Sequence, residues 1–267
     1  MNVATAMIAV WTASLAMAAG AAARPAGEVY AVVVSGVGKD PEDRVAREGV
    51  VNGLRVYLQE TAAIPPERLV VLTPEGNSSA RSTAEGIKNA IGALARSGKP
   101  EDRFVFYYVG LANAVGGALR FNLPGLDITQ EDLATWLAGV KASTQLVVLD
   151  CPYAGKAAKA LARPGRAIVL ASTDQEAYAP RFGSHFVPAL VRPESDANHD
   201  GRVSVLEAFT TAAREIEQWY QQMQILPTET PGIEDDGDGR PSERPWRFEQ
   251  DGGDGRLASE IVLAGGL

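Results

Sequence analysis

The sequence contains very little cysteine and histidine: Cys151 is the only cysteine among 267 residues, and His185 and His199 are the only histidines. A single cysteine cannot form a disulfide within the chain, so no disulfide framework is expected. Cys151 is therefore a free thiol, which leaves two alternatives: a buried apolar side chain or a reactive nucleophile.

Basic clusters are also lacking. The chain has 25 Lys and Arg against 33 Asp and Glu, which gives a net charge of −8. No basic strip, with or without interleaved aromatic residues, is present to follow nucleic-acid phosphates, so no nucleic-acid partner is expected. The acidity favours solubility and the binding of cations.

Long apolar runs are confined to the amino-terminal residues, and no later stretch is long enough for a transmembrane helix. Residues 1–23 are rich in Ala, lack Asp and Glu, and end in small residues before Arg24-Pro25. This pattern is typical of a secretory signal peptide cleaved after Ala23, and it predicts a periplasmic or secreted protein. The alternative is an uncleaved membrane anchor, because no Lys or Arg lies near Met1.

Short apolar runs alternate with helical patterns through the rest of the chain. Alternation of this kind predicts parallel strands joined by helices, and therefore an α/β fold. The capping signature Ser82-Thr83-Ala84-Glu85 and the capping residue Thr129 mark the starts of two helices. The segment 227–255 is rich in Gly and Pro and is expected to be a surface extension. The expected strands are 29–35, 68–72, 104–109, 146–149 and 167–171, and the expected helices are 41–60, 84–96, 130–136, 156–161 and 205–221.

Cys151 follows the apolar strand 146–149 and precedes a small-residue turn and the expected helix 156–161. In such a strand–turn–helix unit, the amides of the helix N-terminus can support a thiolate and an oxyanion. The preceding Asp150 is expected to order the turn by accepting hydrogen bonds from nearby amides.

Two strand ends resemble the active-site signatures of the caspase and legumain-like cysteine peptidases of clan CD. They are Tyr107-Tyr108-Val109-Gly110-Leu111-Ala112-Asn113 and Leu149-Asp150-Cys151-Pro152-Tyr153-Ala154-Gly155. In that superfamily the third strand runs into Gly-His-Gly and the fourth into Asp-x-Cys-x-Ser-Gly, which supply the catalytic dyad. The resemblance covers residues 28–240 and leaves 241–267 as a C-terminal extension. It implies a caspase-like three-layer α/β sandwich with a mostly parallel central sheet.

The resemblance fails at the catalytic positions. Leu111 stands where the family has its histidine, and Pro152 stands where it has its nucleophilic cysteine, one residue after Cys151. Leucine cannot transfer a proton, and proline has neither a thiol nor an amide hydrogen. The sequence thus predicts an inactive peptidase homologue that binds a protein or peptide partner. The alternative is an active cysteine endopeptidase that uses Cys151 with another base, for which His185 is the candidate.

Residues 196–207 match the twelve-residue calcium loop of the EF-hand. Oxygen-bearing side chains occupy the positions that ligate calcium, and Gly201 occupies the position of the sharp bend. Pro188 and Pro193 interrupt the segment that would form the entering helix, so a single weak calcium site is expected. The alternative is a solvated acidic turn, which is also how we interpret residues 234–239 and 251–255. The expected ligands are Asp196, Asn198, Asp200, Arg202 through its carbonyl, Ser204 and Glu207.

Overall fold

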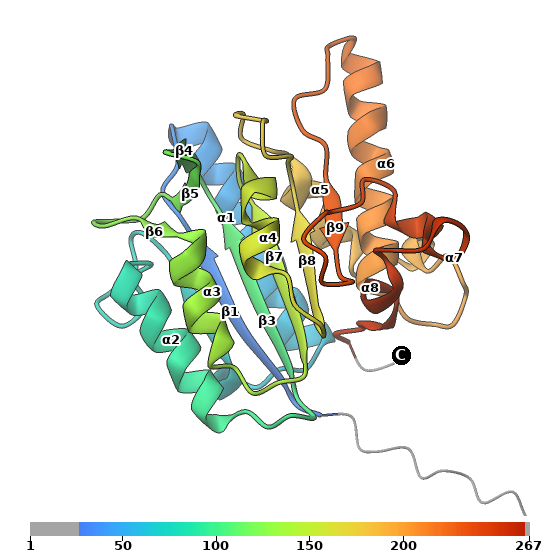
Figure 1. Cartoon of the computed structure of the whole chain (residues 1–267). Helices are drawn as coiled ribbons and strands as arrows, with labels where there is room; N and C mark the ends of the chain where they lie inside the picture. The colour runs from blue at the N-terminus through green and yellow to red at the C-terminus, as the bar shows by residue number, and fades with distance from the viewer. Residues whose placement is uncertain (1–26, 265–267) are drawn as a thin grey trace, which may run out of the picture.

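The computed structural model describes residues 27–264, and the expected signal peptide, residues 1–23, lies outside them. A six-stranded sheet forms the centre of the molecule, in the order β2-β1-β3-β7-β8-β9 (Figure 1). Five strands are parallel, and β9 runs antiparallel to β8. The strands are β1 (Val29–Ser35), β2 (Leu69–Leu72), β3 (Arg103–Val109), β7 (Thr144–Asp150), β8 (Arg166–Leu170) and β9 (Gly232–Glu234).

The central strands are apolar because both of their faces are covered. In β1, Ala31 and Val33 belong to one hydrophobic core, and Val32 and Val34 belong to the other. All four side chains are fully buried. The fold is therefore a three-layer α/β sandwich around a mostly parallel sheet, as the sequence predicts.

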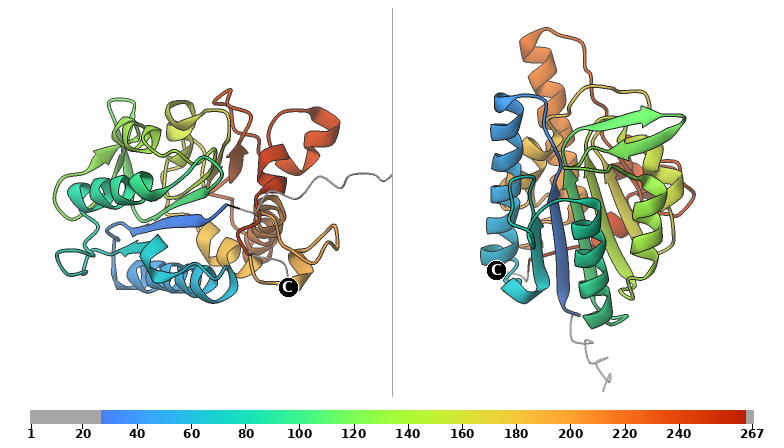
Figure 2. Two further views of the ribbon diagram at one scale, coloured as in Figure 1. Left: turned by 90° about the horizontal axis from the view of Figure 1, so that it is seen from below. Right: turned by 90° about the vertical axis from the view of Figure 1, so that its left-hand side faces the viewer.

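Helices cover the two faces of the sheet, as Figure 2 shows from below and from the side. One face carries α1 (Pro41–Val56), α5 (Phe182–Ala189), α6 (Val205–Met223) and α8 (Arg256–Glu260). The other carries α2 (Ala84–Ser97), α3 (Gln130–Ala138) and α4 (Ala158–Leu161). The predicted cap at Thr129 is confirmed, since it forms a capping box with Asp132. Within the signature Ser82-Thr83-Ala84-Glu85 the N-cap is Thr83, which accepts a hydrogen bond from the amide of Gly86, rather than Ser82. A short helix, α7 (Phe248–Asp251), precedes α8.

A small antiparallel sheet lies between β3 and α3. It consists of β4 (Ala112–Val115), β5 (Ala118–Phe121) and β6 (Ile128–Thr129). Gly116 and Gly117 connect β4 to β5 with φ values of 59° and 85°. Glycine adopts such backbone angles without strain, so this pair forms the tight turn of a hairpin.

The carboxyl-terminal segment packs into the main core. Ile233 in β9 and Ala258, Ile261 and Leu263 after it are buried in the same core as α1, α5 and α6. The expectation that 227–255 is only a surface extension is wrong for residues 232–234, which form the last strand of the sheet.

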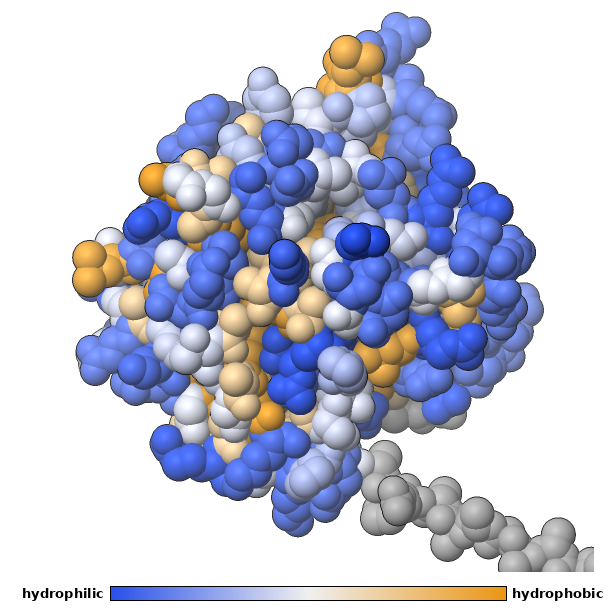
Figure 3. Space-filling view, in the orientation of Figure 1, coloured by the Kyte–Doolittle hydropathy of each residue, from blue (hydrophilic) through white to orange (hydrophobic). Residues whose placement is uncertain are grey.

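The surface seen in Figure 3 is mainly hydrophilic, with small apolar groups scattered over it. Within residues 27–264, no helix is both long enough and apolar enough to cross a bilayer.

Candidate functional site

The two segments that resemble catalytic signatures lie side by side. Strands β3 and β7 are neighbours in the sheet, with Val109 opposite Asp150, and the amide of Gly110 donates a hydrogen bond to the Asp150 carbonyl at 3.2 Å. Leu111 therefore lies next to the turn that holds Cys151 and Pro152. In a parallel sheet this carboxyl edge is where sites are built.

Leu111 is held at this edge by its backbone. Its amide donates to the Val37 carbonyl at 3.0 Å, and its carbonyl accepts from the Tyr108 hydroxyl at 2.7 Å. Its half-buried aliphatic side chain places no titratable group at the expected position of the general base.

Cys151 is sealed inside the protein, with 0% of its surface exposed, in the core between the sheet and helices α2, α3 and α4. Burial, and secondarily the charge of Asp150, raise the pKa of its thiol well above the usual value. A thiolate is the nucleophilic form of cysteine, so burial and the raised pKa both disfavour the nucleophilic form of Cys151.

The turn after Cys151 is fixed by a buried hydroxyl and a strained residue. The Ser172 hydroxyl donates to the Cys151 carbonyl at 2.9 Å and accepts from the Ala154 amide at 3.0 Å. Tyr153 adopts a left-handed conformation, with φ 58°. The expected helix 156–161 begins differently, since Ala154–Ala157 form a 3₁₀ turn and only Ala158–Leu161 are α-helical.

Asp150 points to the opposite face of the sheet from Cys151, where it meets a second buried acid. The Tyr107 hydroxyl donates to Asp150 Oδ2 at 3.3 Å, and Asp150 Oδ1 has no partner among residues 27–264. Burial, with the charge of Glu229 added, raises the pKa of Asp150 to about 8. The Gly183 backbone, in the first turn of α5, acts to lower the pKa of Asp150. Within the described chain no amide of its own turn donates to the Asp150 side chain, so the expectation that Asp150 orders that turn is wrong.

Glu229 is anchored by α5 and α6. The Arg181 amide donates to its Oε2 at 2.8 Å, and the Tyr220 hydroxyl donates to its Oε1 at 3.1 Å. Burial raises the pKa of Glu229 to about 7. The sequence does not predict that Asp150 and Glu229 lie near each other, since 79 positions separate them.

Neither histidine is placed to serve Cys151. His185 lies on α5, across the sheet from Cys151, and its Nδ1 is 3.1 Å from Glu215 Oε2 on α6. Arg192 pairs with the same carboxylate. His199 is exposed in the loop before α6.

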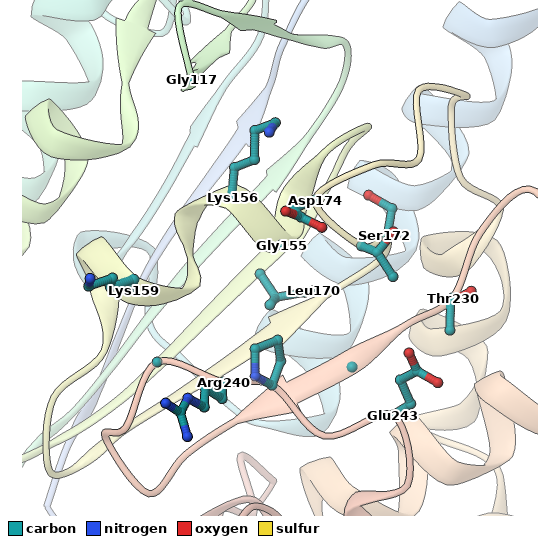
Figure 4. Close-up of a pocket in the computed structure, with 14 residues that line it drawn as sticks. Gly117, Gly155, Lys156, Lys159, Leu170, Ser172, Asp174, Thr230, Arg240 and Glu243 are labelled. Carbon is teal, nitrogen blue, oxygen red and sulfur yellow. The ribbon is translucent and has the colours of Figure 1, made fainter.

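An open groove lies beside the Cys151 turn, with a volume of about 550 Å³. Lys156 and Lys159 reach it from the segment after β7, and Arg240 reaches it from the segment after β9 (Figure 4). None of these three cations forms an ion pair within the described chain. Asp174 and Glu243 also line the groove, which therefore presents three positive and two negative side chains.

The predicted calcium loop folds back on itself before α6. Asp196 accepts hydrogen bonds from the amides of Asp200 and Gly201 at 3.1 and 2.9 Å, and Gly201 has φ 80°. Glu207 accepts from the amides of Ala197 and Asn198 at 3.0 and 3.2 Å. Asp196 and Glu207, the first and last expected ligands, thus both accept hydrogen bonds from the backbone of residues 197–201.

The remaining expected ligands lie along this loop. Asn198 and Asp200 each accept a backbone amide hydrogen two residues later, at 2.8 and 2.9 Å. Ser204, at position 9, is the N-cap of α6 and forms a capping box with Glu207. The entering segment is short, because α5 ends at Ala189 and only a 3₁₀ turn, Pro193–Ser195, precedes the loop.

The two other acidic turns meet in space. Asp254 Oδ1 accepts from the amides of Asp235 and Asp236 at 2.7 and 3.2 Å, which joins 234–239 to 251–255. Within residues 27–264, only Glu234, Asp236 and Asp254 form a cluster of acidic, His or Cys side chains close enough to share a metal ion. In the sequence, the only signal for this cluster is a pair of Asp-Gly-rich turns.

No protein-family model and no curated protein matches the chain. Among solved structures, the chain is similar to a crystal structure of a protein from Geobacter sulfurreducens, with a TM-score of 0.48 and 14% identity. That match covers 77% of this chain and 92% of the Geobacter chain.

Proposed function

We propose that the chain is an exported, catalytically inactive homologue of the caspase and legumain-like peptidases that binds a protein or peptide. The observation that carries this proposal is the composition of the carboxyl edge of β3 and β7. Leu111 and Pro152 occupy the two catalytic positions, and Cys151 is enclosed in the core. Neither Leu111 nor Pro152 carries a group that attacks a peptide bond or moves a proton for it.

Peptidase activity is tested with peptide reporters that carry Asp, Asn, Arg or Lys before the scissile bond. We expect no turnover above the level of the Cys151→Ala variant. Turnover that Cys151→Ala abolishes would establish the alternative, an endopeptidase that uses Cys151.

The thiol provides a second, independent test. A chromogenic disulfide reagent is expected to label the native protein at neutral pH far more slowly than the protein in denaturant, because the Cys151 thiol is buried and its pKa is raised. Rapid labelling of the native protein would contradict the inactive assignment.

The groove beside the Cys151 turn supplies the binding surface. Its three unpaired cations favour a partner segment that carries carboxylates, and its open shape suits an extended peptide. Fluorescence anisotropy with a labelled Glu-rich peptide tests this preference. We expect Lys156→Glu with Lys159→Glu to weaken binding, and Lys88→Glu on the exposed face of α2 to leave it unchanged. Equal binding by both variants would exclude the groove.

We further propose that residues 196–207 bind calcium through Asp196, Asn198, Asp200, Ser204, Glu207 and the Arg202 carbonyl. The loop carboxylates Asp196, Asp200 and Glu207 do not converge as one group among the described residues, so calcium would have to draw them together. The support for the proposal is the wrapped loop, the left-handed Gly201 and the start of α6 immediately after position 9. An affinity of roughly 10⁻⁴ to 10⁻³ M is expected for an isolated extracellular site. Calorimetry on Asp196→Ala with Glu207→Gln tests the loop, and heats unchanged from those of the parent would exclude it.

A further inference from the structure

The strongest unassigned feature is the junction between β9 and the carboxyl-terminal segment. Glu234 is the last residue of β9, Asp236 lies in the turn after it, and Asp254 precedes α8. One oxygen from each of the three carboxylates lies within 4.8 Å of the others. In Figure 1 this junction lies where β9 approaches α7 and α8.

Glu234 differs from an ordinary surface acid because its side chain is buried and one of its oxygens has no hydrogen-bond partner within the described chain. Its side chain is fully buried, and its Oε1 accepts from the amides of Gly237 and Gly239 at 2.8 and 3.1 Å. Its Oε2 is buried and has no hydrogen-bond partner within the described chain. A buried carboxylate oxygen without a partner is costly, and bound cations are a common way to satisfy one.

The neighbouring cation Arg166 does not satisfy this oxygen. Its guanidinium donates to Gln145 Oε1 and to the Leu161 carbonyl. No positively charged side chain of the described residues donates a hydrogen bond to Glu234 Oε2.

The surrounding hydrogen bonds leave free coordination positions. Asp236 Oδ1 accepts from the Asp238 amide at 2.9 Å, and its side chain is exposed. Asp254 Oδ2 accepts only the Ser242 amide, at 3.0 Å, within the described residues. Asp235, in contrast, holds the amides of Gly255 and Ala258 at 2.8 and 2.7 Å and fixes the start of α8.

A path for an ion is present. A surface cavity of about 420 Å³ is lined by Asp236, Gly253 and Arg256 among others, so Asp236 is reached directly from solvent. Arg256 lies over the Phe248 ring, 5.3 Å from its centroid.

We propose that Glu234, Asp236 and Asp254 bind a hard divalent cation, preferentially calcium, that joins β9 to the segment before α8. Oxygens up to 4.8 Å apart suit metal–oxygen distances of about 2.3–2.6 Å, whereas magnesium requires about 2.0–2.1 Å in near-ideal octahedral geometry. Water completes the coordination shell on the exposed side. The proposal concerns different residues from the 196–207 loop and does not depend on the proposed function.

The site is tested by calorimetry of the full chain with calcium alone, using the matched variants Asp236→Ala and Asp238→Ala. Each side chain accepts one amide hydrogen from two residues later, at 2.9 and 2.7 Å. Both substitutions therefore remove the same kind of hydrogen bond and the same charge, but only Asp236 belongs to the cluster. We expect Asp236→Ala to weaken one binding event by about tenfold or more, and Asp238→Ala to preserve it.

Two further variants separate this site from the loop before α6. Glu207→Gln is expected to leave the event that depends on Asp236 unchanged. Glu234→Gln removes the unpartnered charge, so it is expected to raise the melting temperature without calcium and to reduce the shift that calcium produces. Equal titrations for Asp236→Ala, Asp238→Ala and the parent would overturn the proposal. A calcium-dependent shift in Glu234→Gln equal to that of the parent would also overturn it.

Discussion

At the scale of single residues, Asp150 and the first turn of α5 pack very closely at the strand ends. A Cβ atom on Gly183 would lie 2.1 Å from Asp150 Oδ2, 2.9 Å from the Tyr107 hydroxyl and 2.9 Å from Val50 Cγ1. Real Cβ contacts are longer than this, so the absence of a side chain at Gly183 lets α5 approach the sheet.

Gly183→Ala is therefore expected to destabilise the protein by about 2–3 kcal/mol. The matched control is Gly49→Ala in α1, where a Cβ meets nothing within 4 Å. That variant is expected to stabilise the protein by about 0.5–1 kcal/mol, because alanine favours a helix over glycine. Denaturant unfolding measures both, and equal effects would contradict the packing argument.

Asp150 also predicts a pH dependence. The pKa of Asp150 is about 8 in the folded protein, chiefly because of burial, against about 3.9 in an unfolded chain. Between these values the folded state holds a proton that the unfolded state has lost, so this residue stabilises the protein at low pH. Its contribution falls as pH rises from about 4 to about 8.

Asp150→Asn removes this titration. We expect its melting temperature to rise relative to that of the parent between pH 5 and pH 8, measured with a chelator present so that bound cations do not contribute. If the melting temperatures of the two proteins changed with pH in parallel, Asp150 would not ionise as described.

At the scale of elements, the parallel strands were predictable and the last strand was not. The runs at β1, β3 and β7 are apolar because both faces of each strand are buried, and this signal survives in the sequence alone. Strand β9 has three residues, too few for an alternation to show, and one of them is the buried Glu234. An acidic residue in a coil-rich segment is typical of a turn, so the edge of the sheet was missed.

The residues of the candidate site likewise divide into those that the sequence predicts and those that only the structure brings together. Leu111, Cys151 and Pro152 could be placed at one edge of the sheet from the sequence because each of them follows a recognisable strand. The groove cations Lys156 and Arg240, and the acids Asp150 and Glu229, come from distant segments that only the folded sheet brings together. The hairpin β4–β5 did leave a signal, the Gly116-Gly117 pair between short strands.

The segment after α8 provides an element-scale prediction. Ile261 is 2% exposed, lies in the main core, and accepts the amide of Val205 at the start of α6 with its carbonyl at 2.9 Å. Ile261→Ala is expected to cost about 2–5 kcal/mol. The neighbouring half-buried Val262 is the control, and Val262→Ala should cost much less. Similar small losses in both variants would place this segment outside the cooperative core.

At the scale of the whole molecule, one sheet is shared by two cores. Trp136 on α3 packs against one core, and Trp219 on α6 packs against the other. Because alternate residues of the same strands fill both cores, neither core can lose its packing without disturbing the other.

The described domain is therefore expected to unfold in a single transition. Two double variants, Trp136→Phe with Trp246→Phe and Trp219→Phe with Trp246→Phe, retain Trp219 or Trp136 as the reporter within residues 27–264. Their tryptophan fluorescence should give the same midpoint as far-ultraviolet circular dichroism of each variant. Two separated midpoints would contradict a shared core.

The parallel sheet also gives the molecule a direction. Strand β1 begins at Val29 on the amino edge, whereas Leu111, Pro152 and the groove cation Lys156 follow strands at the carboxyl edge. A seven-residue strand separates these edges by about 23 Å. The start of β1 and the turns that hold Leu111 and Pro152 therefore lie at opposite edges of the sheet, so a label placed at Val29 and one placed at Lys156 would report on opposite ends of the central strands.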